Sequence, residues 1–254
     1  MAINPEKLTI TINERDWVTA LLYPAQKDRA GTTLILGHGA GANQLHPFMR
    51  LFAGGLTERG LDVLTFNFQY MEQGRRVPDP KAKLENCYRA VIAAARNHKK
   101  LKGNRVVIGG KSMGGRIASQ VAALECAGST PLSDPATNSS RKSKPQVAPP
   151  SGEIAGLVFL GYPLHPPGKS EQLRDAHLPQ ITAPMLFVQG SRDAFGTADE
   201  IRATIKKHHL LATLHVVDGG DHSLKVPKAL GIPQDEVYAS TIDAIAAWIL
   251  KGKS

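Results

Sequence analysis

Residues 106–116 read VVIGGKSMGGR. The valine and isoleucine run predicts a strand and the residues after it a helix, with the pattern G-x-S-x-G, Gly110 to Gly114, at the turn between them. A serine at such a sharp turn exposes its hydroxyl, and the small residues beside it leave room for neighbouring backbone. The stretch therefore predicts that Ser112 is a nucleophile. The N–H group of Met113, near the start of the helix, is the expected first donor of an oxyanion hole.

Outward from this turn, apolar strands alternate with amphipathic helices. The predicted strands are residues 8–12, 18–23, 33–36, 63–66, 106–108, 156–160, 185–188 and 214–217. The predicted helices are residues 47–59, 84–98, 116–124, 199–208 and 234–250. From the third strand onward the runs are almost continuously apolar, which is typical of parallel strands buried on both faces. The polar residues 13–16 predict a hairpin that joins the first two strands at an antiparallel edge. We therefore expect an α/β fold with about eight, mostly parallel strands and helices on both faces.

One segment, residues 127–152, interrupts this alternation. It is rich in proline and serine, and only Leu132 and Val147 are large aliphatic residues. Such a segment buries too little apolar area to offset the entropy lost on ordering. We expect a flexible surface insertion within a single domain spanning residues 1–254, because strands of the same type lie on both sides of it.

Composition and charge narrow the classes of function. The 254 residues carry 31 Lys and Arg against 22 Asp and Glu, a net charge of +9, which raises the possibility of nucleic-acid binding. The basic residues are scattered, however, and lack the interleaved aromatic side chains of a platform for single-stranded nucleic acid, so we expect no nucleic-acid partner. Two cysteines, Cys87 and Cys126, are too few for a disulfide framework or a cysteine zinc site. No leader sequence or apolar run of bilayer length is visible, so we expect a cytoplasmic protein without membrane, metal or cofactor.

A base and an acid for Ser112 follow two later strands. Asp193 comes after the strand at 185–188, and His222 comes after the strand at 214–217. Parallel strands end at the same edge of a sheet, and the chain order Ser, Asp, His is that of one class of serine hydrolase. His222 is the expected base and Asp193 the expected acid that orients it. Asp218 and Asp221 remain alternatives for the acid.

The loop after the strand at 33–36 reads GHGAGA from residue 37 to residue 42. Its N–H groups can complete the oxyanion hole, with Ala40 as the first candidate donor and Gly39 as the second. The same letters fit a dinucleotide fingerprint, but the helix is delayed beyond the loop and no acidic residue ends the next strand, which argues against that function. The candidates for lining the substrate site are residues on loops at this edge: His38, Tyr162, His165, Arg75 and Arg76.

Three stretches carry a resemblance to a known family: GGKSMGGRIAS at 109–119, QGSRDAFGTA at 189–198 and GGDHSLK at 219–225. The sequence resembles the α/β-hydrolase superfamily over nearly its whole length, and more narrowly its dienelactone-hydrolase-related branch. Within that branch it is similar to small bacterial and testis-expressed hydrolase-like proteins and to the hydrolase-like domain of a non-specific-lethal complex subunit. The resemblance implies the α/β-hydrolase fold and a triad of Ser112, Asp193 and His222. Serine at position 112 departs from the cysteine of true dienelactone hydrolases.

The expected function is that of a serine hydrolase acting on small ester or thioester substrates through an acyl-enzyme. Residues 161–184, where this superfamily usually inserts a cap, leave room for only a minimal one, which predicts an open site and modest acyl groups. The expected partners are the small-molecule substrate and, as one option, a second copy of the chain in a homodimer. A binding or scaffold protein on the same fold is the alternative, because fold does not determine function. Amidase or peptidase activity is a weaker third hypothesis.

Overall fold

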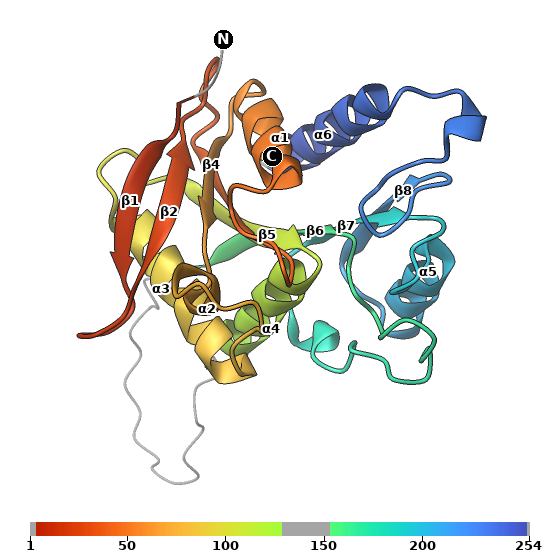
Figure 1. Ribbon diagram of the computed structural model, residues 1–254, viewed down its shortest axis with the longest axis horizontal. Helices are drawn as coiled ribbons and strands as arrows, with labels where there is room; N and C mark the ends of the chain where they lie inside the picture. Colours follow the sequence, from red (N-terminus) through yellow and green to blue (C-terminus); the bar gives the residue numbers. More distant parts are fainter. Residues whose placement is uncertain (1–3, 129–152, 253–254) are drawn as a thin grey trace, which may run out of the picture.

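The computed structural model describes residues 4–128 and 153–252, in which eight strands form one sheet (Figure 1). The strand order is β1-β2-β4-β3-β5-β6-β7-β8. The strands are β1 Glu6–Thr11, β2 Trp17–Tyr23, β3 Thr32–Gly37, β4 Asp62–Phe66, β5 Arg105–Lys111, β6 Ile154–Leu160, β7 Met185–Gly190 and β8 Ala212–Val217. Strand β2 pairs antiparallel with both β1 and β4, and every other pair is parallel. The predicted α/β class, the eight mostly parallel strands and the antiparallel hairpin at one edge are confirmed.

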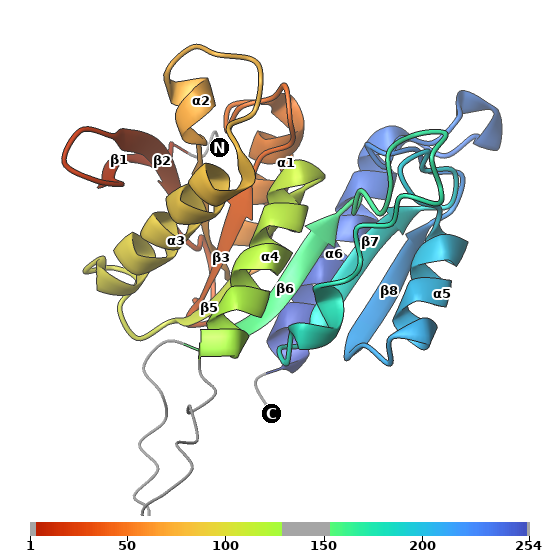
Figure 2. The same cartoon turned by 90° about the horizontal axis from the view of Figure 1, so that it is seen from below.

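Helices cover both faces of the sheet (Figure 2). They are α1 Pro47–Thr57, α2 Gln69–Glu72, α3 Lys81–Asn97, α4 Met113–Gly128, α5 Ala198–Lys207 and α6 Gln234–Lys251, with two short 3-10 helices, η1 Leu178–Gln180 and η2 Lys228–Leu230. Side chains of the central strands alternate between two hydrophobic clusters. In β3, Leu34 and Leu36 pack with α1 and α6, whereas Ile35 packs with α3 and α4. Both faces of the central parallel strands β3, β4 and β7 are therefore buried, which accounts for their apolar sequences.

Tyr88 links helix α3 to the middle of the sheet. Its hydroxyl lies 2.8 Å from the carbonyl oxygen of Ile35 and 2.6 Å from that of Gly109, and it accepts a hydrogen bond from Gly109 N–H at 3.0 Å. Burial raises the pKa of the Tyr88 hydroxyl, so the group stays protonated and keeps its donor. This side chain therefore connects β3 and β5 three residues before Ser112.

The structure adjusts several predicted boundaries. Helix α4 starts at Met113, three residues earlier than predicted, and continues through residue 128. The first two residues of the predicted insertion at 127–152 are thus helical, and the rest of it lies outside the described residues. Between β6 and β7, residues 161–184 contain only η1, in keeping with the predicted minimal cap.

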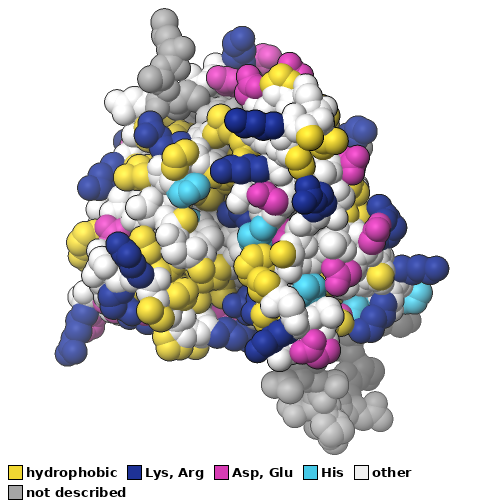
Figure 3. Space-filling view, turned by 45° about the vertical axis from the view of Figure 1, so that its right-hand side comes forward, with side chains coloured by type: hydrophobic (Ala, Val, Ile, Leu, Met, Phe, Trp, Pro, Cys, Tyr) yellow, Lys and Arg dark blue, Asp and Glu magenta, His cyan; other side chains and the backbone are white. Residues whose placement is uncertain are grey.

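The surface shows no single dominant charge on the face drawn in Figure 3. Lys and Arg side chains are dispersed there among acidic and apolar ones. Within the described residues, no helix has the length and apolar character needed to cross a membrane.

Candidate active site

Ser112 stands at a strained turn between β5 and α4. Its φ angle is +50°, a left-handed conformation that is unusual for a residue with a side chain. The turn is held by a hydrogen bond from Ser112 N–H to the carbonyl of Leu160 at 3.1 Å, and the carbonyl of Ser112 accepts from Arg116 N–H at 3.0 Å. Ser112 therefore has the sharp strand-to-helix turn that the sequence predicts.

The two glycines of the motif leave room for strand β3. A Cβ atom on Gly110 would lie 2.2 Å from the carbonyl oxygen of Gly37, and one on Gly114 would lie 2.1 Å from the same atom. Real side chains do not approach backbone so closely. Gly110 and Gly114 are thus required because the turn packs closely against β3. This agrees with the prediction that small residues beside Ser112 leave room for neighbouring backbone.

His222 lies between Ser112 and Asp193. Its Nε2 atom is 2.8 Å from the Ser112 hydroxyl, and its Nδ1 atom is 2.8 and 3.0 Å from the two carboxylate oxygens of Asp193. The aromatic ring of Phe195 packs against the imidazole, tilted by 31° with 4.2 Å between ring centroids. The structure thus brings together the three side chains that the sequence named as nucleophile, base and acid.

Asp193 is buried, and each of its oxygens has a fixed donor besides His222. The N–H of Phe195 donates to Oδ1 at 2.8 Å, and Nε2 of Gln189 donates to Oδ2 at 2.8 Å. Gln189 cannot reverse its amide without loss, because Nε2 also donates to the carbonyls of Gly196 and Tyr162 while Oε1 accepts from Tyr162 N–H. This environment fits a carboxylate with two accepting oxygens.

The two alternative acids have other partners. Asp218 accepts from the Ser191 hydroxyl at 3.1 Å and from the N–H of Gly219. Asp221 accepts from the N–H groups of Ser223 and Lys225, which shapes the loop that carries His222. Among the described carboxylates, the one in hydrogen-bond contact with the imidazole is therefore Asp193.

The predicted oxyanion-hole residues surround Ser112. Met113 opens helix α4, so its N–H has no carbonyl one turn earlier in the helix to bind. Gly39 lies beside the serine, since a Cβ atom on it would be 3.6 Å from the Cβ of Ser112. Ala40 lines the same cavity as Ser112 and His222. The backbone of the β3 loop and the start of α4 thus meet at the serine.

His38 shapes this loop and does not line the cavity. It is fully buried, with Nδ1 2.8 Å from the carbonyl of Gly39 and Nε2 accepting from Phe68 N–H at 3.1 Å. This pairing requires the tautomer protonated on Nδ1. Burial lowers the pKa of His38 to about 4, which keeps the ring neutral. His38 therefore ties the loop after β3 to the loop after β4.

The other predicted lining residues also lie away from the cavity. Tyr162 is buried and donates its hydroxyl to the carbonyl of Arg174. His165 is buried, with Nδ1 against the carbonyl of Pro166 and Nε2 3.2 Å from Glu200. Arg75 binds Asp79 at 2.6 Å, four residues along the chain, and Arg76 is exposed outside the cavity. The assignment of these side chains to the substrate site is corrected. Tyr162, His165 and Arg75 contact other parts of the protein, and Arg76 is exposed to solvent, so none of the four lines the cavity.

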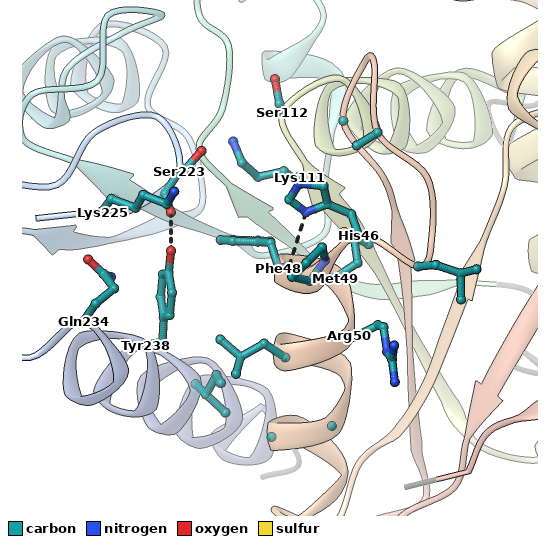
Figure 4. A pocket seen from close by; sticks show the side chains of 18 of the residues that line it. His46, Phe48, Met49, Arg50, Lys111, Ser112, Ser223, Lys225, Gln234 and Tyr238 are labelled. Carbon is teal, nitrogen blue, oxygen red and sulfur yellow. Dashed lines mark hydrogen bonds between the residues drawn. The ribbon is translucent and has the colours of Figure 1, made fainter. Parts of the chain in front are cut away.

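The cavity extends from Ser112 into the space between α1 and α6 (Figure 4). Its volume is about 1460 Å³. Apolar side chains on its walls include Leu45, Phe48, Met49, Leu51, Tyr238 and Ile242. Sequence analysis did not find these residues, because the pairing of two distant helices leaves no local signal in the chain.

Lys111, the residue between the motif glycine and Ser112, is a further member of the site. Its Nζ atom donates to the carbonyl oxygen of His222 at 2.6 Å and lies 5.9 Å from the centroid of the Phe48 ring. Burial lowers the pKa of the ammonium to about 8, although the negative charges of Asp193 and Asp221 act in the opposite direction. Within the described residues, no group of three or more His, Cys, Asp or Glu side chains is arranged to hold a metal ion.

Comparisons with known proteins agree with this architecture. Among solved structures, a dienelactone hydrolase from Anabaena variabilis matches with a TM-score of 0.68 and 15% identity over 99% of both chains. An alpha-beta serine hydrolase homologue from Coxiella burnetii matches with a TM-score of 0.66 and 15% identity over 98% of this chain and 97% of the other. At these identities the likeness concerns the fold alone.

A curated relative, the quorum-quenching protein AidA of Acinetobacter baumannii, is 36% identical over 103 residues. The match covers 38% of this chain and 33% of the relative, so the chain spans about a third of that protein. Residues 30–250 match the family model described as an alpha/beta hydrolase domain, and this range contains every strand from β3 onward together with Ser112, Asp193 and His222. By this match and by its fold, the chain belongs to the alpha/beta hydrolase domain family.

Proposed function

We propose that this hydrolase-family chain is a serine hydrolase that cleaves carboxylic ester or thioester bonds through an acyl-enzyme on Ser112. The observation that carries the proposal is the position of His222, within 3.0 Å of both the Ser112 hydroxyl and the Asp193 carboxylate. Serine hydroxyls are weak nucleophiles, and an adjacent oriented base is what activates them.

The hydrogen bonds define the direction of proton transfer. Asp193 accepts from Nδ1, so the neutral imidazole presents its Nε2 lone pair to Ser112. As the Ser112 oxygen bonds to the substrate carbonyl carbon, Nε2 takes the hydroxyl proton, and the carbonyl electrons move onto the oxygen. The N–H of Met113 and an N–H of the loop at Gly39 and Ala40 would stabilise this oxyanion.

The reaction is then completed in two steps. Collapse of the tetrahedral intermediate expels the alcohol or thiol, which takes its proton from Nε2 of His222. Water next gives its proton to the same nitrogen, attacks the acyl-enzyme and releases the carboxylic acid and Ser112. The open cavity beside Ser112 and the short segment between β6 and β7 support small substrates that enter without displacing a large cap.

The test uses a fluorophosphonate probe with wild type and Ser112→Ala. We expect strong covalent labelling of the wild type and none of the variant, because the probe needs the activated oxygen. A panel of short p-nitrophenyl esters and acyl-CoA thioesters then identifies the bond cleaved, with Ser112→Ala as the blank. Equal labelling of both proteins, or turnover that survives the substitution, would refute the proposal. A silent wild type would instead support a binding role for the fold.

A further inference from the structure

Lys111 places an ammonium group in the cavity without a counter-ion. Its Nζ atom has a hydrogen-bond acceptor in the carbonyl of His222, which uses one of three N–H donors. Within residues 4–128 and 153–252, no carboxylate oxygen lies within 4.0 Å of this nitrogen. A charge removed from water is normally paired, since an unpaired one is costly.

The two nearby carboxylates whose charges act on Lys111 accept hydrogen bonds from other groups. Asp193 accepts from His222, Gln189 and the N–H of Phe195. Asp221 accepts from backbone N–H groups of its own loop. They influence the ammonium only over a longer distance, and the net effect of burial still lowers the pKa of Lys111. The protein itself thus leaves this cation short of an anionic partner.

The ammonium is also placed where a substrate must lie. In Figure 4, Lys111 lies between Ser112 and the ring of Phe48, and all three line the same cavity. A substrate whose carbonyl carbon is at Ser112 has the apolar surface of Phe48 on one side and the free donors of Lys111 beside it. The other ionisable groups that line the cavity are Tyr23, His46, Arg50, Glu58, Arg59, His222, Lys225, Asp235 and Tyr238.

We propose that Lys111 binds a carboxylate of the substrate, so that the preferred esters or thioesters carry a second, ionised carboxyl group near the bond that is cleaved. This inference rests on the proposed function and names the substrate class for it. The carboxylate completes the coordination of the ammonium, while the bond from Lys111 to His222 remains. Lys111 is then both a binding residue for the substrate anion and an anchor for the loop of His222.

The test compares matched substrates that differ by one charge. One pair is mono-p-nitrophenyl adipate and p-nitrophenyl hexanoate, in which the carboxylate is on the acyl side. The other is 4-carboxyphenyl butyrate and phenyl butyrate, in which it is on the leaving group. For each pair, the ratio of kcat/KM for the anionic over the neutral ester is measured with wild type, Lys111→Met and Lys228→Met. Lys228 is exposed and lies outside the cavity, so its variant controls for the loss of one positive charge.

In Lys111→Met we expect the ratio to fall roughly 10- to 100-fold for at least one pair, the range for losing a hydrogen bond to a charged group. In Lys228→Met it should change less than about twofold, because exposed charges are screened by salt. An equal loss of activity on both members of both pairs would show that Lys111 only anchors His222, and would overturn the inference. The neutral esters report the proposed function separately, since their hydrolysis by wild type needs Ser112 but no substrate anion.

A second measurement uses only wild type and avoids any folding defect of Lys111→Met. Adipate and adipamide have the same chain, and the first carries the charges that the second lacks. We expect adipate to inhibit hydrolysis of p-nitrophenyl hexanoate competitively at concentrations at least tenfold lower than adipamide. Equal inhibition constants would contradict an anion subsite at Lys111.

Discussion

Replacing Asp193 by asparagine should nearly abolish activity, for a reason specific to this site. Both carboxylate oxygens accept from fixed donors, Phe195 N–H on one and Gln189 Nε2 on the other. An asparagine side chain has one oxygen and one NH₂ group, so either orientation points an N–H against an N–H. The orientation that preserves the bond from Phe195 puts the NH₂ group toward Gln189 and beside Nδ1 of His222.

The expected magnitude follows from the imidazole tautomer. An NH₂ group beside Nδ1 favours the tautomer protonated on Nε2, which cannot accept the Ser112 proton. Such a change costs roughly 10³- to 10⁴-fold in kcat, or about 4–5.5 kcal/mol in the activation barrier. The unmatched donors should lower the free energy of unfolding by about 1–3 kcal/mol.

The assay is steady-state hydrolysis of a p-nitrophenyl ester together with urea unfolding. Asp218→Asn is the matched control, because it makes the same chemical change on a neighbouring loop where the carboxylate has no contact with His222. We expect its kcat to stay within about threefold of wild type. Retention of more than about a tenth of wild-type kcat by Asp193→Asn would refute the assignment of Asp193 as the acid. A comparable loss of kcat in Asp218→Asn would identify Asp218 as the acid instead.

Three other predictions concern charge, packing and buried hydrogen bonds. The kcat/KM ratio of adipate monoester to hexanoate ester should be constant from about pH 6 to about pH 7, where the free carboxyl group of the ester is ionised. It should fall as pH rises through about 8, because Lys111 loses its proton there; a flat ratio to about pH 10 would contradict this. Gly114→Ala should lower the urea midpoint and kcat together, since the new methyl group meets the carbonyl of Gly37 at 2.1 Å; a fully active, equally stable variant would show that the turn yields. Tyr88→Phe should reduce the free energy of unfolding by about 2–4 kcal/mol with the m-value unchanged, because a buried N–H and a carbonyl lose their partner. Tyr238→Phe, which loses one half-buried bond of 3.2 Å, should cost less than about 1.5 kcal/mol.

The fold could be predicted from the sequence because each strand of the central sheet has its own recognisable run of apolar residues. Apolar runs without alternation belong to strands buried on both faces, and Leu34, Ile35 and Leu36 show that burial in β3. The turn at Ser112 could be predicted in the same way, because the two glycines that it requires, Gly110 and Gly114, lie only four residues apart in the sequence. The chain order of Ser112, Asp193 and His222 placed all three at one edge, and the structure brings them into contact.

The cavity itself could not be predicted in this way. Its walls come from α1 and α6, and the contacts of Tyr238 with Phe48 depend on how those helices cross. His165 and Tyr162 were placed correctly on a loop at the right edge, but their partners Glu200 and Arg174 decide that they point away from the site. Arg75 is different, because its partner Asp79 is four residues away and was visible in the sequence.

The outward order of strands β5, β6, β7 and β8 has a consequence for synthesis on the ribosome. Strands β6, β7 and β8 each pair with the strand made just before them, so the sheet can grow at one edge as the chain emerges. Ser112 follows β5, whereas His222 comes 110 residues later, after β8. At 5–20 residues per second, the nascent chain carries an unactivated serine for roughly 5–20 s. On the proposed mechanism, Ser112 therefore becomes a nucleophile only after β8 has joined the sheet and His222 has been made.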